Sequence, residues 1–319
     1  MKLSYKIILL CLFVGLANSC HRSPYYNLES LPGVNLQFLF DWNGYNQIPP
    51  GMNLIFYPIQ DGNSMKEDYT GAPIRAQLQY DGGEISLPVG RYNVAIYNDY
   101  TYSILYRNME QFHTAEGYLD EYNRQPLASR STSNRNVAEP DIFYVTQLNE
   151  LSITAQDNNR TITVYPELVT LTLFVHVEAQ GIENISMADG GIYGVAGSVM
   201  LSTGTSPAET YSNRLFPLNI RTDELSTQTN VFLPKDKLTC PYTLELAFLL
   251  RNNTVSIGKY KYDITEQIRK PLQDNNGKIP PEGIHVWIRG IVIEDVGAPG
   301  GGFDAVVDQW GEEVNIELQ

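Results

Sequence analysis

The chain has 319 residues, enough for two domains of ordinary size, and its formal net charge is −14. The negative field of such an acidic protein repels the phosphates of nucleic acid, and the sequence has no basic stripe to counter it. A nucleic-acid partner is therefore excluded. One long β-sandwich is the alternative to two domains.

The first residues have the order of a secretory signal peptide. Lys2 and Lys6 give a charged start, an apolar run follows from Ile7 to Leu16, and small residues come next. The apolar run has about ten residues, whereas a membrane-spanning helix needs about 20. We therefore predict that residues 1–19 are a signal peptide that is removed.

Cys20 follows these small residues directly, an arrangement that resembles the lipobox of bacterial lipoproteins. We predict lipidation of Cys20, a linker over residues 20–30, and attachment to the outer membrane with the periplasmic or surface face left open. The alternative is an ordinary signal peptide with an incidental cysteine. Cys11 is then discarded and Cys240 stands alone, so no intramolecular disulfide is expected.

The first half of the chain reads as short strands separated by turn residues, with hardly any helical periodicity. Asp81-Gly82-Gly83 supplies glycines with the positive φ that a tight hairpin needs. The expected strands are Val34–Phe40, Met52–Tyr57, Ala76–Tyr80, Glu84–Leu87, Tyr92–Tyr97, Ile142–Val145 and Leu151–Ile153.

Residues 106–140 are polar and poorly patterned, which predicts a surface excursion. Its Arg124, Arg130 and Arg135 are candidate sites for trypsin-like cutting. A polar segment near residue 157 predicts a boundary between an N-terminal domain, 31–157, and a C-terminal domain, 158–319.

In the second half, Leu171, Leu173 and Val175 share one face of the strongest predicted strand. A short helix is expected from Ile264 to Lys270, stopped by Pro271. The expected strands are Leu168–Val177, Asn230–Leu233, Tyr242–Leu250, Val255–Asp263, Ile284–Glu294 and, behind a glycine hinge, Val314–Leu318.

The sequence offers no set of residues for catalysis, so we predict that the protein is not an enzyme and needs no cofactor. His21, His113, His176 and His285 form no metal-ligand motif, and the last two lie in strand patterns where structural roles dominate. Cys240 precedes a proline beside an apolar strand, which favours a buried, inert thiol over a nucleophile.

Aromatic side chains give the remaining candidate site. Tyr97, Tyr100, Tyr102 and Tyr106, with Trp42 from an earlier turn, form a candidate stacking platform for sugar, against the alternative of packed sheet residues.

Several segments, taken in their order along the chain, resemble the fimbrillin-like lipoproteins of Bacteroidetes. This group includes fimbrial anchor and accessory subunits. Besides the lipobox cysteine they are Gly90–Asn98, Tyr165–Val169, Gly194–Gly197, Asp263–Thr265 and Gly302–Trp310. The resemblance implies two tandem transthyretin-like Greek-key β-sandwiches and a role in or beside a pilus. It also implies pilus-subunit partners that join by strand addition. A surface lipoprotein that binds glycan or a host ligand is the alternative function.

Overall fold

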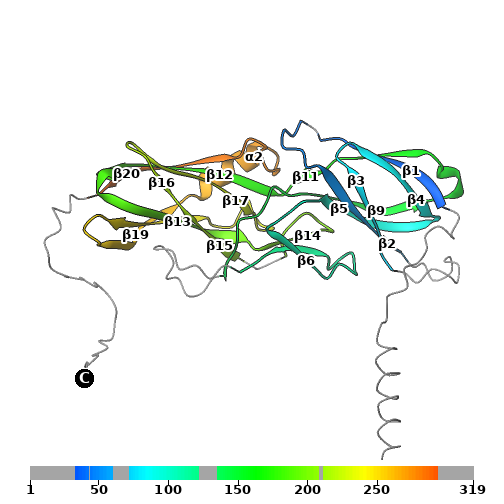
Figure 1. Ribbon diagram of the computed structural model, residues 1–319, viewed down its shortest axis with the longest axis horizontal. Coiled ribbons are helices and arrows are strands. Elements are labelled where there is room, and N and C mark those ends of the chain that lie inside the picture. Colours follow the sequence, from blue (N-terminus) through cyan, green and yellow to red (C-terminus); the bar gives the residue numbers. More distant parts are fainter. Residues whose placement is uncertain (1–32, 43, 60–71, 122–134, 208–210, 294–319) are drawn as a thin grey trace, which may run out of the picture.

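A computed structural model describes residues 33–42, 44–59, 72–121, 135–207 and 211–293 of the chain. Nearly all of its regular structure is strand, which confirms the predicted all-β class. The molecule is elongated, with the start of β1 at one end and the end of β20 at the other (Figure 1). The predicted signal peptide, Cys20 and the strand behind the glycine hinge lie outside the described residues.

The N-terminal part is built on one eight-stranded sheet in the order β10-β1-β4-β3-β2-β5-β9-β11. Its residues alternate between two cores, as strand geometry requires: Leu54 and Phe56 lie in the N-terminal core, whereas Ile55 and Tyr57 lie in a second cluster. The strands are β1 (Gly33–Phe40), β2 (Gly51–Pro58), β3 (Ile74–Gln79), β4 (Gly82–Pro88), β5 (Gly90–Asn98), β9 (Tyr144–Ile153), β10 (Arg160–Val164) and β11 (Glu167–Leu168).

The predicted hairpin glycines have the expected backbone. Gly82 has a φ of +116° and packs so closely that an added Cβ would lie 2.0 Å from the Phe38 carbonyl oxygen. Gly82 therefore both turns the chain and lets β4 approach β1.

One short segment of the chain supplies both edge strands of this sheet. β10 pairs in parallel with β1, matching Phe38 with Ile162, and β11 pairs antiparallel with β9. The first sheet thus continues to Leu168, beyond residue 157, although the division into folding domains at 157 stays a prediction.

The predicted surface excursion over 106–140 is wrong for its described residues. β6 (Ile104–Arg107), β7 (Glu116–Leu119) and β14 (Ser198–Met200) form a three-stranded sheet, and β8 (Arg135–Asn136) pairs with β15. Phe112, Ala115 and Leu119 are buried in the same cluster as Ile55 and Tyr57. The few apolar residues of this segment are too widely spaced among polar ones to give the alternation that predicts a strand. Arg124 and Arg130 lie outside the described residues, and Arg135 pairs with Glu121.

The C-terminal part is a β-sandwich. In one layer β13 lies between β18 and β15, and in the other β17 lies between β16 and β12, with β20 beyond β12. β13 and β17 meet at one residue pair, Ala196 with Phe232. The strands are β12 (Thr170–Gln180), β13 (Ile185–Ala196), β15 (Tyr211–Pro217), β16 (Asn219–Ile220), β17 (Leu225–Phe232), β18 (Thr243–Leu250), β19 (Val255–Asp263) and β20 (Ile284–Val292).

The core between these layers confirms the predicted face of the strongest strand. Leu171, Leu173 and Val175 are fully buried in it, together with Leu244 and Phe248 from the opposite layer. The transthyretin-like and Greek-key details of the predicted fold stay predictions.

Helix α2 runs from Thr265 to Asp274, so the prediction that Pro271 ends it is wrong. Proline in a helix loses one backbone hydrogen bond and crowds the preceding turn. Here the last turn is retained because Ile268 and Leu272 are fully buried in the C-terminal core. Burial of apolar side chains therefore outweighs the local preference of proline.

The second cluster, which holds Ile55 and Tyr57, is a junction cluster that the two parts share. Phe143, on the approach to β9, and Phe232 of β17 are both fully buried, and their ring centroids are 6.0 Å apart. The Thr170 hydroxyl adds polar contacts, because it donates to the Asp141 carbonyl at 2.9 Å and accepts the Phe143 N–H at 3.0 Å. The junction is therefore packed like an interior rather than linked by a free tether.

Candidate functional site

Trp42, one of the predicted stacking residues, lies in the N-terminal core. Its side chain is 8% exposed, and the indole Nε1 donates a hydrogen bond to the Tyr80 carbonyl at 2.7 Å. Tyr144 packs edge-on against it at 5.2 Å between centroids. A ring held this way has no open face for a ligand.

Tyr97 and Tyr106 lie on the opposite face of the sheet from Trp42. Their ring centroids are 4.9 Å apart, and the Tyr106 hydroxyl is 2.9 Å from that of Thr101. Burial raises the pKa of both phenols above the ordinary value. These tyrosines belong to the junction cluster, so the predicted residues do not form one platform.

Tyr100 and Tyr102 are the exposed members of the predicted set, with 69% and 88% of their surface accessible to solvent. Their loop is held by Asp141, whose Oδ2 accepts hydrogen bonds from the backbone N–H groups of Tyr102 and Ser103 at 2.6 and 2.7 Å. The Ser103 hydroxyl donates to the same oxygen at 2.9 Å. The loop therefore presents two phenol rings to solvent from a fixed backbone.

A row of stacked rings on the C-terminal sandwich was not predicted. Phe174, His285, His176 and Trp287 stack in that order, with adjacent centroids 4.8, 5.2 and 4.1 Å apart. Arg289 lies over the indole at 5.1 Å. The row exists because β12 and β20 are parallel neighbours in which Phe174 faces His285 and His176 faces Trp287. Sequence showed the alternation in each strand but not that they are adjacent.

The histidines of this row have structural contacts. His176 Nε2 and His285 Nδ1 are 3.0 Å apart, and His176 Nδ1 lies 3.5 Å from a Glu224 carboxylate oxygen. Across the described part of the chain, no three His, Cys, Asp or Glu side chains gather as metal ligands. Because the rings face one another, solvent meets their edges, a poor surface for stacking a sugar.

Cys240 is 2% exposed, and its Sγ is 3.8 Å from the Gly194 carbonyl oxygen. Burial raises the pKa of the thiol, which keeps it protonated at neutral pH. The geometry therefore favours an inert packing role for this cysteine.

The long edge of β20 is a candidate surface for a protein partner. Among the described residues, β20 pairs with β12 on one side only. On the other side, Gln267 of α2 contacts the Trp287 backbone: its Oε1 accepts the N–H at 2.8 Å, and its Nε2 donates to the carbonyl at 3.1 Å. The Gln267 amide thus occupies one position where a further strand could pair, and at the end of β20 the Tyr260 hydroxyl donates to the Val292 carbonyl at 3.5 Å.

The fold places the protein in the class of elongated β-sandwich proteins seen in solved adhesin structures. A crystal structure titled "a putative adhesin from Bacteroides ovatus ATCC 8483" matches with a TM-score of 0.65 at 23% identity, over 85% of this chain and 96% of that one. The fimbrial anchor protein Mfa2 from Porphyromonas gingivalis aligns at a TM-score of 0.45 and 11% identity, over 74% and 83% of the two chains.

The family model described as "Domain of unknown function (DUF5119)" matches residues 21–215, and the chain belongs to that family. A curated relative from Bacteroides ovatus, "Putative fimbrium anchoring subunit Fim4B", is 25% identical over 98% of both chains. The predicted resemblance to fimbrial subunits of Bacteroidetes is therefore confirmed.

Proposed function

We propose that this protein is a lipid-tethered fimbrial subunit of the anchoring or accessory kind, with no catalytic activity and no cofactor. The observation that carries the proposal is the similarity to the fimbrium anchoring relative, which extends over 98% of both chains. A match of that extent includes both sheet systems and their junction, rather than a common module alone.

The arrangement of the two ends supports a tether at Cys20. Gly33 begins β1 at one end of the molecule, and Val292 ends β20 at the opposite end (Figure 1). The chain from Cys20 to Gly33 can span at most about 45 Å when fully extended. Lipid at Cys20 would thus keep the β1 end near the membrane and direct the β20 end away from it.

The tether is tested on protein isolated from native membranes. Mass spectrometry of the N-terminal peptide should show Cys20 acylated and residues 1–19 removed, and Cys20→Ser should release the protein from the membrane. Cys240→Ser is the matched control, because this thiol is buried, and it should stay membrane-bound. An unmodified N-terminus beginning at Met1 would contradict the tether.

We further propose that other subunits join this one by strand addition at β20. An added strand would displace the Gln267 side chain from the Trp287 backbone and pair with it. Trp287→Pro removes this edge-facing N–H, whereas Trp287→Ala removes the ring and keeps the N–H. Subunits that co-purify with the native protein should be retained by the alanine variant and lost from the proline variant. Equal retention by both would place the contact elsewhere.

Glycan binding is a second candidate, favoured by the exposure of Tyr100 and Tyr102 on a fixed loop. Exposed rings of this kind stack on sugars in many binding proteins. A glycan array would show signal that is lost on replacing both tyrosines.

A further inference from the structure

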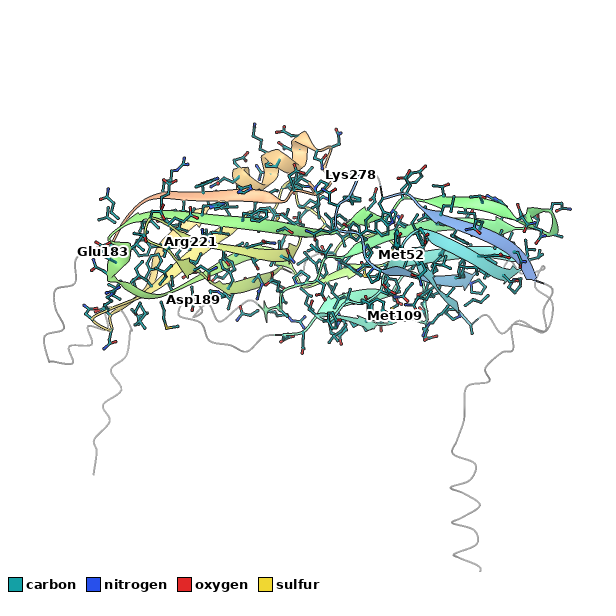
Figure 2. The ribbon with its side chains drawn as sticks, turned by 45° about the horizontal axis from the view of Figure 1, so that its top comes forward. Met52, Met109, Glu183, Asp189, Arg221 and Lys278 are labelled. Carbon is teal, nitrogen blue, oxygen red and sulfur yellow. The ribbon has the colours of Figure 1, made fainter. Side chains whose placement is uncertain are left out.

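A small cavity lies at the junction of the two parts. Its volume is about 140 Å³, and its walls come from the loop after β1, the β11 segment, the turn after β14, the turn after β17 and the end of α2. Figure 2 labels Lys278 at this place, beside the end of α2. The charged residues of its lining are Glu167, Lys235, Lys237 and Lys278.

Positive charge is concentrated in these walls, against the trend of the whole protein. The chain carries a formal net charge of −14, yet Lys235, Lys237 and Lys278 meet at the cavity with Glu167 as the one acidic residue in its lining. Lys278 Nζ pairs with Glu167 Oε1 at 3.1 Å. The charge of Glu167 also acts on Lys237, and Lys235 is exposed, so the lining holds three ammonium groups against one carboxylate.

Lys237 is the central group. Burial lowers the pKa of its ammonium, and the charge of Glu167 raises it in part. Within the described ranges, its Nζ makes no hydrogen bond or ion pair with the protein. Its backbone is fixed, because Lys237 N–H donates to the Pro234 carbonyl at 3.1 Å and the Tyr242 hydroxyl donates to the Lys237 carbonyl at 3.0 Å. The side chain is only partly buried, so it keeps some contact with water, and a bound anion would give its ammonium a charged hydrogen-bond partner at the cavity wall.

Neutral donors complete the lining. Thr203 and Thr205 place their hydroxyl oxygens 2.9 Å apart, and Asn276 also lines the cavity. Hydroxyl and amide N–H groups donate hydrogen bonds to oxygen acceptors, as lysine does. An engineered cavity of about 150 Å³ holds a benzene molecule, so the ligand, or the part of it that enters, is small.

We propose that this junction cavity binds a small oxyanion, a carboxylate or phosphate group, between Lys235 and Lys237. Both lysines lie in the turn after β17, and the cavity also borders Tyr45 and Glu167 of the N-terminal part. An anion that binds the folded protein alone stabilises it. The site is separate from the tether at Cys20 and from the β20 edge.

The experiment measures thermal unfolding of the full mature chain at constant ionic strength, with lactate, phosphate or chloride added. Lactate or phosphate should raise Tm with a saturable dose dependence, and which of the two acts identifies the chemistry of the ligand. Chloride should give no saturable increase. An equal increase with chloride, or none with either oxyanion, would overturn the proposal.

Lys237→Met should weaken oxyanion binding at least tenfold, because it keeps the length of the side chain and removes its charge. Lys270→Met is the matched control, since Lys270 is an exposed lysine of α2 that pairs with Asp274. This variant should bind the oxyanion as tightly as the unaltered protein. Identical binding by both variants would contradict the site.

A second measurement needs no variant. Amine acylation of the native protein, mapped by mass spectrometry, should show Lys237 protected by the active oxyanion while Lys270 reacts at the same rate with or without it. Protection that is equal at both lysines would show an adventitious ion effect and would overturn the proposal.

Discussion

The two sheet systems end in different ways. The N-terminal sheet ends in β10 and β11, which have five and two residues and come from one continuous segment. Two of the outer strands of the C-terminal sandwich, β19 and β20, have nine residues each, although β16 at another edge has two. Short edges limit pairing with other chains, whereas long edges offer a row of backbone donors and acceptors. The C-terminal part therefore has the longer edge strands for pairing with another chain.

The largest predicted effect concerns the packing that joins the two parts. Phe143→Ala should lower the free energy of unfolding by about 3–5 kcal/mol, because it removes a fully buried ring from the junction cluster. Calorimetry should then resolve two transitions, one for each part.

Phe248→Ala is the matched comparison, since that ring is fully buried in the C-terminal core alone. It should cost a similar free energy and lower only the C-terminal transition. A single shared transition in both variants would mean that the two parts unfold as one unit.

The next largest effect on stability is expected at the edge of β20. Gln267→Ala should lower the free energy of unfolding by about 1–2 kcal/mol, because two hydrogen bonds to the Trp287 backbone are lost. Hydrogen exchange should accelerate at the Trp287 amide, and the purified protein should self-associate more strongly.

Glu266→Ala is the control for this change, because Glu266 lies on the same helix with its side chain 75% exposed. It should leave exchange at Trp287 unaltered. No change in exchange after Gln267→Ala would mean that the amide side chain does not protect this edge.

A smaller effect tests the three-stranded sheet beside the junction. Burial would raise the pKa of Glu116, but hydrogen bonds from Arg107 and Ser198 and the charge of Arg107 hold it below the ordinary value of 4.5. Since the folded-state pKa is the lower one, the stabilisation is present above about pH 4.5 and is lost as pH falls through the folded-state pKa.

Glu116→Gln should therefore flatten the acid side of the stability curve, by about 1 kcal/mol because Arg107 is half exposed. Urea unfolding between neutral and acidic pH measures this. An unchanged acid slope would assign the pH dependence to other carboxylates.

The smallest effect is expected at the exposed tyrosines of the N-terminal part. Replacing Tyr100 and Tyr102 together with alanine should change stability by less than about 0.5 kcal/mol per site, since both rings are exposed. Any glycan-array signal that is lost in this variant therefore reports binding rather than unfolding. A signal that persists would remove the case for a sugar site on this loop.

Sequence reasoning located most strands because the period of alternation is local. The buried face of Leu171, Leu173 and Val175, and the positive φ of Gly82, depend on neighbouring residues and were predicted correctly. The helix end at Pro271 was missed because burial of Leu272 in the C-terminal core, a distant contact, opposes a local preference.

The amino-acid sequence by itself determined the all-β class, the strand faces and the resemblance to fimbrial subunits, since each depends on order along the chain. Tertiary structure alone decided which face of the sheet each aromatic residue occupies, separating Trp42 from Tyr97. It also brought Lys237 to Glu167 and placed Gln267 on the edge of β20. The reason is physical: these contacts join residues far apart in the chain, and only the pairing and packing of whole strands fixes such distances.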